Sequence, residues 1–258
     1  MGISVIIHTY NNENIIRDCL EAVKDFDEIV VCDMYSNDKT LEIVKEYNCK
    51  IVMHNKIGYV EPARNFAIQQ ASNEWVLIVD SDEIISDQLK DYLYKFIENN
   101  KKYNAVKIPR LNYYWGVKIE IQYPDYVTRF IKKEKVDWPS QIHSQPIIEG
   151  EIYTIPKSQR ELAIKHHCVS TIKQLFESLN VYTDKELEKM INKKQKMPNV
   201  FWAFFKSLFL IFEKFILKKG YKSGADGFIL CTYFGLYKFI ALIKYREFLI
   251  KNLENKND

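Results

Sequence analysis

The chain has 258 residues, of which 47% are hydrophobic and 28% charged, so it can bury one large core. Its formal net charge of +3 is too small to indicate nucleic-acid binding. The five cysteines are scattered without any Cys-x-x-Cys spacing, which argues against a zinc site or a disulfide framework and favours a cytoplasmic protein. The N-terminus enters an apolar, strand-like run directly, so no signal peptide is expected.

The first hundred residues alternate between strand-like and helix-like patterns. Short apolar runs indicate buried strands over 3–7, 28–32, 50–53 and 75–79. Apolar residues at helical spacing follow each run, over 15–23, 41–47, 64–71 and 87–99. This βαβαβαβα order predicts an α/β fold with a parallel, doubly wound sheet and right-handed crossovers. The turns contain neither a Gly-x-Gly-x-x-Gly motif nor a P-loop, which disfavours a dinucleotide cofactor.

The fourth strand-like run ends in the acidic segment Asp80-Ser81-Asp82-Glu83. Carboxylates grouped at the end of a buried strand repel one another and lose solvation. A hard cation such as Mg²⁺ or Mn²⁺ would remove both penalties. The alternative is a solvated turn in which Ser86 caps the next helix. Because ligands of open α/β sheets bind at the carboxyl ends of strands, the cation site is favoured.

Two other strand-like runs also end in polar turns. The first run leads into Thr9–Asn14, and the second ends at Asp33. If these strands are neighbours of the fourth, the three turns converge on one crevice, which is the nucleotide-binding geometry of such sheets. Without a glycine-rich loop, phosphate would be bound through a metal and basic side chains.

The pattern changes after residue 104. Short strands are expected over 105–109, 117–121, 127–132 and 145–148, in a stretch rich in tyrosine and tryptophan. These rings could stack on sugar faces, although most of them are also ordinary half-buried strand residues. His143 and the pair His166-His167 suit a metal ligand or a general base.

Helical patterns replace strands from Ser170 onward. A charged helix is expected over 171–196, and two apolar stretches follow over 200–217 and 227–245. Lysines interrupt both stretches before they reach the ~18–20 apolar residues that span a bilayer. They form either a helical pair on a membrane surface or the core or dimer helices of a soluble protein. The wide apolar stripe with lysines at its rim favours the membrane surface.

Several segments together resemble the inverting glycosyltransferases of family 2, which have the GT-A fold. They are 3–14 (ISVIIHTYNNEN), 28–40 (EIVVCDMYSNDKT), 61–67 (EPARNFA), 75–83 (WVLIVDSDE) and His143. The segment 219–228 (KGYKSGADGF) resembles the helical tail of the lipopolysaccharide-core β-glucosyltransferase-like branch. The resemblance implies a GT-A domain at 1–168, with a nucleotide-sugar half at 1–104 and an acceptor half at 105–168. A helical C-terminal region follows at 169–258.

The resemblance also implies roles for individual residues. Nucleotide-sugar binding falls to Thr9, Tyr10, Asn11, Asp33, Arg64, Asp80 and Ser81. Within this set Asp33 would bind the base, Arg64 would neutralise the diphosphate, and Asp80 would lie by the ribose. Asp82 would hold Mn²⁺ or Mg²⁺, with His167, or the adjacent His166, as a further ligand.

The general base departs from the pattern of this branch, which usually has His-Glu where this chain has His143-Ser144. A serine cannot act as a base at neutral pH. Either His143 accepts the acceptor's proton, or a carboxylate does (Asp125, Asp137 or Glu149), or activity is impaired. We take His143 and Asp125 as the catalytic candidates.

These features together predict a metal-dependent transferase. Its donor would be a UDP-hexose or UDP-N-acetylhexosamine, and its acceptor a glycan or lipid-linked molecule of lipopolysaccharide, capsule or a related surface glycan. It would act in the cytoplasm or on the inner face of the cytoplasmic membrane, as a monomer or a homodimer. One alternative is a sugar-nucleotide nucleotidyltransferase, although Thr9–Asn14 lacks the glycine-rich loop of that class. Another is a non-catalytic glycan-binding relative, suggested by Ser144.

Overall fold

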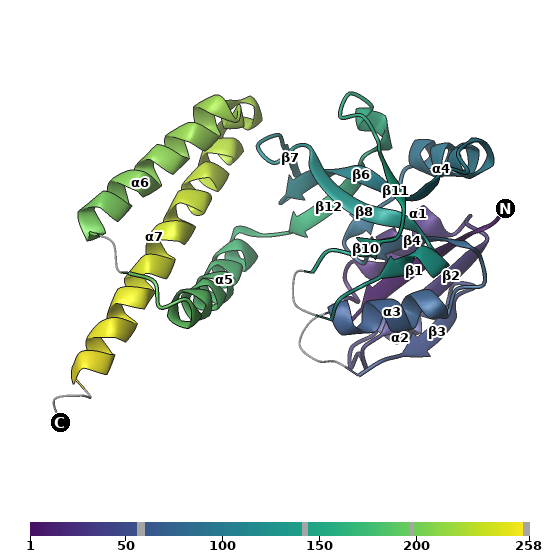
Figure 1. The fold of residues 1–258 in the computed structure, drawn as a ribbon, viewed down its shortest axis with the longest axis horizontal. Helices are drawn as coiled ribbons and strands as arrows, with labels where there is room; N and C mark the ends of the chain where they lie inside the picture. Colours follow the sequence, from purple (N-terminus) through teal and green to yellow (C-terminus); the bar gives the residue numbers. More distant parts are fainter. Residues whose placement is uncertain (56–59, 141–143, 197–198, 255–258) are drawn as a thin grey trace. The chain divides into compact units, whose positions relative to one another are not determined.

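The computed structural model describes residues 1–55, 60–140, 144–196 and 199–254. Two compact units emerge, one built from Met1–Leu111 and Pro124–His166 and the other from Asn112–Tyr123 and His167–Asp258. We call them unit 1 and unit 2 and describe each by itself (Figure 1). The functional division at 168/169 expected from the sequence remains a proposal.

Four parallel strands form one half of the sheet in unit 1. They are β1 (Ile3–Thr9), β2 (Glu28–Asp33), β3 (Lys50–Met53) and β4 (Trp75–Asp80), in the order β3-β2-β1-β4. This confirms the predicted parallel arrangement and makes β1 the neighbour of both β2 and β4. In the register, Thr9 pairs with Asp33 and His8 pairs with Asp80. The three polar strand ends therefore meet at one edge.

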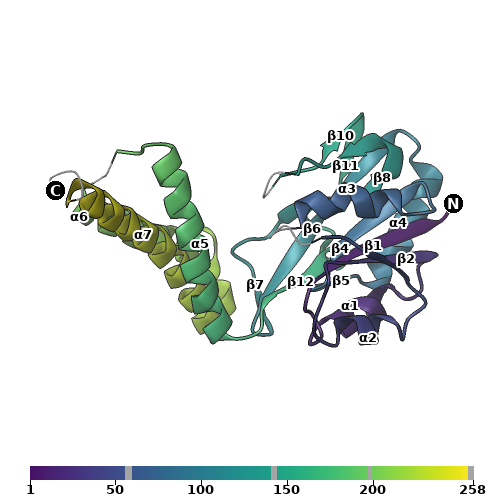
Figure 2. The same cartoon turned by 90° about the horizontal axis from the view of Figure 1, so that it is seen from below.

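Helices cover both faces of these strands (Figure 2). They are α1 (Ile16–Val23), α2 (Thr40–Val44), α3 (Glu61–Gln69) and α4 (Asp87–Asn99). Because side chains alternate along a strand, Val5 of β1 packs with α1 and α4, whereas Ile6 packs with α3 on the opposite face. Helix α3 begins three residues before the predicted start, because Pro62 is compatible with the first turn.

The sheet becomes mixed beyond β4. The further strands are β5 (Glu83–Ile84), β6 (Tyr103–Tyr114), β7 (Val117–Ile119), β8 (Asp125–Lys132), β11 (Glu151–Thr154) and β12 (Ile164–Val169). The sheet order continues β4-β8-β6-β12-β5, and β8 runs antiparallel to β4. Two short strands, β9 (Val136–Asp137) and β10 (Ile147–Ile148), form a separate pair. The strand expected over 145–148 is thus shorter than predicted, and β5, β9, β11 and β12 were not predicted.

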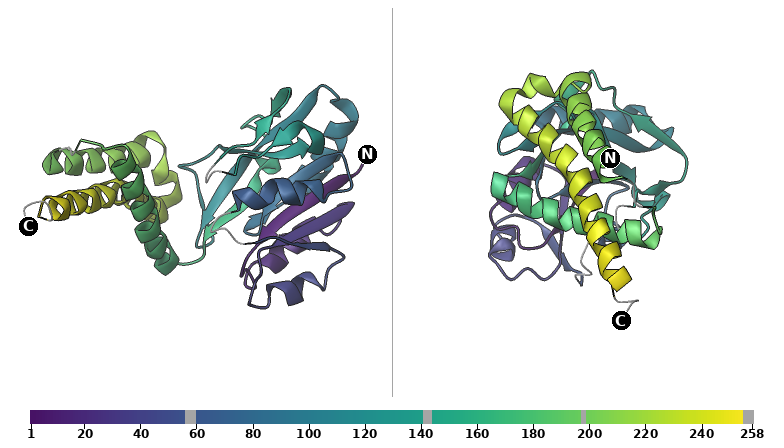
Figure 3. Two further views of the ribbon diagram at one scale, coloured as in Figure 1. Left: turned by 60° about the horizontal axis from the view of Figure 1, so that its bottom comes forward. Right: turned by 90° about the vertical axis from the view of Figure 1, so that its left-hand side faces the viewer.

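Unit 2 is mainly helical, as the C-terminal patterns predicted. It contains α5 (Ile172–Asn192), α6 (Val200–Phe212) and α7 (Gly224–Glu254), with a π-helical turn at Glu213–Leu217 after α6. Helices α6 and α7 lie side by side as an antiparallel hairpin (Figures 1 and 3). The hydroxyl of Ser207 donates to the carbonyl of Gly235 at 2.7 Å, where α6 and α7 approach closely.

The last helix is longer and more continuously apolar than the sequence analysis expected. By length and composition alone, the helix over Gly220–Asn252 could cross a membrane, although the sequence analysis dismissed a span. Only 28% of its apolar window is buried within the structure. Most of this apolar window is therefore not covered by other parts of the described structure.

Candidate active site

The carboxyl ends of β1, β2 and β4 border a cavity of about 310 Å³. It is lined by His8, Thr9, Tyr10, Asn12, Met34, Val60, Asp80, Ser81, Asp82 and His166. The structure thus brings together five of the residues assigned to the nucleotide-sugar and the metal. We call this space the strand-end cavity. It has the position in which open α/β sheets bind their ligands.

Hydrogen bonds connect the polar turns that follow β1 and β2. Asn11, at a φ of 52°, exchanges side-chain and main-chain hydrogen bonds with Asn37 at 2.8 and 2.9 Å. The main-chain N–H of Asn11 donates to Ser36, whose hydroxyl donates to the carboxylate of Asp33 at 2.5 Å. The Asn11 side chain therefore shapes the rim of the cavity, and Asp33 is a fully buried acceptor beneath it.

Three arginines neutralise two of the carboxylates at the end of β4. Arg64 donates to Asp80 at 3.1 Å, and Arg129 binds the other oxygen of the same carboxylate. Burial opposes the ionisation of Asp80, but Arg129 and Arg64 outweigh it and hold the pKa of this carboxyl well below its usual range. Asp80 is therefore an anion fixed between two buried cations.

The second of these carboxylates, Glu83, is fully buried at the start of β5. One of its oxygens accepts the main-chain N–H of Asp80 at 3.0 Å, and the other accepts from Arg110 at 3.1 Å. The repulsion expected from the sequence is thus relieved by arginines at two of the three positions. The predicted cation is therefore not needed to neutralise Asp80 and Glu83, and the prediction of a cation site stays open at Asp82.

Of the two adjacent histidines of β12, His166 is the one that lies beside Asp82. The Nε2 atom of His166 lies 3.5 Å from the Oδ2 atom of Asp82. The ring of His167 instead stacks on Tyr113 in unit 2, with ring centroids 5.4 Å apart. Because neighbouring residues of a strand point to opposite faces, only one of the two histidines can face Asp82. The geometry therefore favours His166 as the ligand beside Asp82.

The donors at Asp82 and His166 fit a metal held partly by its substrate. Among the residues that the structure describes, no group of three or more His, Cys, Asp or Glu side chains could hold a metal alone. One carboxylate and one imidazole suit Mn²⁺ or Mg²⁺ when diphosphate oxygens and water complete the coordination. Both side chains line the strand-end cavity, where a diphosphate could reach the ion.

A neutral histidine completes the floor of this cavity. His8 is buried at the end of β1, and the sequence argument did not single it out. Burial, together with the nearby Arg64, lowers the pKa of His8 to about 3. His8 is therefore uncharged at neutral pH and adds no positive charge to that of the arginines.

A second cavity, of about 230 Å³, lies on the arginine side of Asp80. It is lined by Glu61, Arg64, Arg110, Val127, Thr128, Arg129, Trp138, Ser144 and Gln145. The guanidinium of Arg64 stacks over the Trp138 ring at 4.5 Å. Arg64 thus contributes to this cavity and to Asp80, whereas the sequence assigned it to the diphosphate.

The catalytic candidates are placed unequally. His143 lies outside the described residues, and its neighbour Ser144 donates a hydrogen bond to the carbonyl of Pro139 at 2.5 Å. Asp125 accepts two hydrogen bonds from Arg110, at 2.6 and 3.0 Å, and so belongs to the ion-pair network. The alternatives Asp137 and Glu149 bind Asn65 and Lys135. None of these three carboxylates lines the strand-end cavity.

The residues around the two cavities that sequence reasoning missed are Arg110, Arg129 and His8. Arg129 lies on β8, which is more than forty residues from β4 in the sequence but adjacent to it in the sheet. No local pattern marks this pairing. The available signal was Arg129 directly before the apolar pair Phe130-Ile131, because an arginine in a buried stretch needs an acidic partner.

Comparisons with known proteins agree with this geometry. A sequence profile described as glycosyl transferase family 2 matches residues 4–147. An uncharacterised glycosyltransferase of Rickettsia typhi is 28% identical over 266 residues, covering 97% of this chain and 88% of its own length. The mixed sheet flanked by helices, with a helical C-terminal region, is the GT-A-type fold that the sequence predicted.

A characterised relative covers less of the chain. The poly(ribitol-phosphate) β-N-acetylglucosaminyltransferase TarS of Staphylococcus aureus is 37% identical over 125 residues, which are 43% of this chain and 22% of that enzyme. A crystal structure of TarS 1–349 with UDP-GlcNAc matches 44% of this chain and 35% of that chain, with 36% identity and a TM-score of 0.38. Glucosyl-3-phosphoglycerate synthase of Mycobacterium tuberculosis, solved with Mn²⁺, UDP and phosphoglyceric acid, is 20% identical over 44% of this chain and 43% of that chain, with a TM-score of 0.37.

Proposed function

The chain belongs to glycosyltransferase family 2, and we propose that it transfers a hexose or N-acetylhexosamine, with inversion, from a UDP-sugar to a glycan or lipid-linked acceptor. The acceptor would belong to lipopolysaccharide, capsule or a related bacterial surface glycan. The observation that carries this proposal is the strand-end cavity, where Asp80, Asp82 and His166 meet the turns after β1 and β2. The name of the TarS relative supports an N-acetylhexosamine as the transferred sugar.

The nucleotide would lie over the turns that follow β1 and β2. Thr9 and Tyr10 line the cavity there, and the uracil ring offers an N–H donor that a carboxylate can accept. Asp33 has the required chemistry, although a base would have to reach it past the Ser36 hydroxyl that now binds it. The linked turns, held by Asn11 and Asn37, would keep this pocket formed before the donor arrives.

The diphosphate would lie against Asp82 and His166. These side chains would hold Mn²⁺ or Mg²⁺, which supplies stabilisation of the negative charge on the departing nucleotide. Asp80 would accept from the ribose, because its carboxylate is held ionised by Arg64 and Arg129. Such a preformed set of charges costs little reorganisation at the moment of reaction.

The acceptor would approach from the second cavity, on the side of Arg110 and Trp138. Inversion requires a base that removes the proton from the attacking hydroxyl. His143 and Asp125 remain the candidates for this role. Both hydrogen bonds from Arg110 reach Oδ2 of Asp125, so a proton accepted by this carboxylate would weaken its ion pair with Arg110.

The test is hydrolysis and transfer with UDP-sugars in the presence of Mn²⁺ or Mg²⁺. We expect Asp82→Asn to lower kcat/KM about 10- to 100-fold, by analogy with the loss of one metal-site interaction. The matched control is Asp18→Asn, an exposed aspartate on α1. Turnover that survives both EDTA and Asp82→Asn would refute metal-dependent transfer. Binding of no nucleotide at all would favour a non-catalytic relative.

A further inference from the structure

One side of α6 exposes large apolar side chains to solvent. Phe201, Phe205, Leu208, Phe209, Phe212 and Ile216 recur at helical spacing, with 44% to 78% of each residue exposed. We call these six residues the α6 stripe. Single exposed apolar residues are common, but a continuous row of this kind marks a surface that binds something apolar.

The stripe continues onto α7 through contacts between aromatic rings. Phe204 of α6 meets Phe239 of α7 at 5.5 Å, and Phe215 meets Phe228 at the same distance. Phe228 is itself exposed, and α7 also exposes Leu236 and Ile243. The apolar surface therefore spans both helices of the hairpin.

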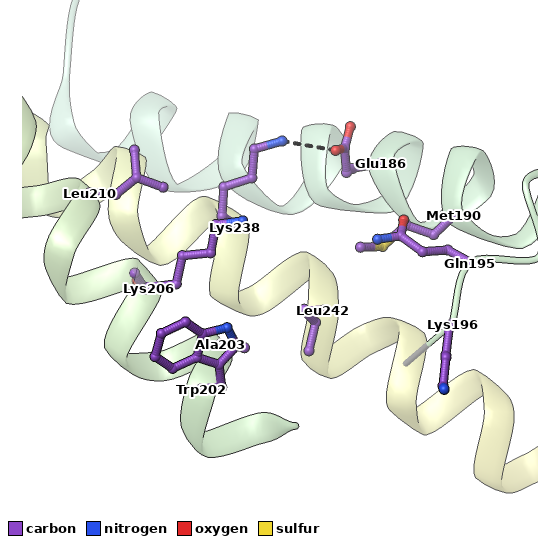
Figure 4. A pocket seen from close by; sticks show the side chains of 11 residues that line it. Glu186, Met190, Gln195, Lys196, Trp202, Ala203, Lys206, Leu210, Lys238 and Leu242 are labelled. Atoms are coloured by element: carbon purple, nitrogen blue, oxygen red, sulfur yellow. Dashed lines mark hydrogen bonds and ion pairs between the residues drawn. The ribbon is translucent and has the colours of Figure 1, made fainter. Parts of the chain in front are cut away.

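The flank of the hairpin that faces α5 differs from the α6 stripe because it carries ion pairs between helices. A pocket of about 400 Å³ lies there, and Lys206, Lys238 and Glu186 are among the residues that line it (Figure 4). Lys238 binds Glu186 at 2.9 Å, and Lys244 binds Asp184 at 2.5 Å. The flank that faces α5 therefore combines apolar lining residues, such as Met190 and Leu242, with ion pairs, whereas the α6 stripe contains no charged side chain.

Positive charge gathers along the chain around α6. Residues 189–222 contain nine lysines and one acidic residue, Glu213, a local net charge of +8. Three exposed lysines precede α6 (Lys193, Lys194 and Lys196), and three follow its π-helical turn (Lys218, Lys219 and Lys222). The apolar surface therefore has clusters of cations before and after it in the sequence. This combination complements the acyl region and the anionic headgroups of a lipid surface.

We propose that the α6–α7 hairpin binds an anionic bilayer, with the α6 stripe inserted at the boundary of headgroups and acyl chains. A second copy of this chain would also cover the stripe, but it would bring two regions of charge +8 together, and like charges across an interface are unfavourable. The lipid surface instead supplies the missing negative charge. This proposal is independent of the sugar-transfer chemistry.

The hairpin would lie along the membrane and not cross it. Although α7 is long and apolar enough to span, Lys238 and Lys244 tie it to Glu186 and Asp184 of α5. Tyr245 also donates to the carbonyl of Gln195 at 2.6 Å. A spanning α7 would have to break these contacts or draw charged α5 residues into hydrocarbon, which is costly.

Flotation of the full-length protein with lipid vesicles tests the proposal. We expect it to float with phosphatidylcholine vesicles that contain phosphatidylglycerol, and much less with phosphatidylcholine alone. Replacing Phe205, Leu208 and Phe212 by Glu should lower the bound fraction roughly tenfold or more, because charges on the inserted face oppose entry. These side chains are exposed, so the variant should keep its fold. The matched control is Phe176→Glu, an exposed aromatic of α5, which should float like the parent protein.

Several outcomes would overturn the proposal. They are a wild-type chain that floats with neither vesicle, a triple variant that floats normally, and a control that loses flotation equally. A dimer in solution that the triple variant dissociates, without flotation of the parent, would assign the stripe to a second copy. Resistance to alkaline carbonate extraction would show a spanning helix. Donor hydrolysis by the triple variant should equal that of the parent, which separates this test from that of the transferase activity.

Discussion

The two units differ in the side chains that they bury and expose. Unit 1 places charges in its interior, where Asp80, Glu83 and Arg129 form a network under the strand-end cavity. Unit 2 leaves aromatic rings on its surface, along the α6 stripe. A buried ion pair is seldom a net gain in stability, and an exposed apolar face is a liability in water. Each unit therefore departs from the usual distribution of charged and apolar side chains at the place that we assign to binding, the strand-end cavity in unit 1 and the α6 stripe in unit 2.

The largest effect on stability is expected when a buried cation is removed from unit 1. Arg129→Met leaves Asp80 and Glu83 with less compensation, so we expect a loss of about 3–5 kcal/mol in the free energy of unfolding. Urea unfolding measures this loss. Arg17→Met, which breaks an exposed and solvent-screened pair with Glu46, should cost much less than Arg129→Met. Equal losses for the two variants would mean that the network contributes no more than a surface pair.

The next test measures how the free energy of unfolding depends on pH, because the buried His8 of unit 1 contributes to that dependence. The pKa of His8 falls from 6.5 to about 3 on folding, so between these values the unfolded chain binds a proton that the folded chain does not. The folded state should therefore lose stability as pH falls through this window, with a slope of roughly 1 kcal/mol per pH unit from His8. His8→Gln should flatten that slope in urea unfolding at a series of pH values. An unchanged slope would show that His8 is protonated in the folded chain.

A smaller effect should separate the two adjacent histidines of β12. Because His166 lies beside Asp82, His166→Gln should weaken the Mn²⁺-dependent binding of UDP about tenfold. His167→Gln removes a ring that stacks on Tyr113 and should leave that binding unchanged. Calorimetric titration of both variants with and without Mn²⁺ measures the difference. The reverse ranking would restore His167 as the ligand.

The smallest effect concerns one of the few buried polar contacts inside the hairpin of unit 2. Ser207→Ala removes the donor to the Gly235 carbonyl, which should cost about 1 kcal/mol. Thermal unfolding followed by circular dichroism measures it, and the control is Thr232→Ala, which removes a solvent-exposed hydrogen bond to the Phe228 carbonyl within α7. A change well above this size would mean that the hairpin depends on polar contacts as strongly as unit 1 does.

Local sequence patterns were sufficient for the first half of the fold and for part of the site. The apolar runs of β1 to β4 and the polar residues that end them predicted a parallel sheet and its ligand-binding edge, because both depend on residues close together in the chain. Asp33, Asp80 and Asp82 were found in this way. Helix α4 has the predicted bounds, and Ser86 accepts from Leu89 as its cap.

The remainder depends on pairings between distant strands. Arg129 reaches Asp80 only because β8 adds to β4, and His166 reaches Asp82 only because β12 pairs with β5. No periodicity within β8 or β12 encodes these neighbours. The sequence therefore attributed the relief of carboxylate repulsion to a metal ion, whereas arginines from β6, β8 and α3 provide most of it.

The segment from Asp80 to Glu83 is restrained at both ends, and this restraint bears on the free energy of cation binding at Asp82. Asp80 is held by two guanidinium groups and its main-chain N–H by Glu83, so Asp82 belongs to a segment whose two ends are fixed. The backbone that carries the Asp82 carboxylate is therefore restrained on both sides. Binding of a cation at Asp82 would therefore cost little further conformational entropy. The affinity for the ion would depend on the rigidity of the segment between Asp80 and Glu83 as much as on the chemistry of the ligands.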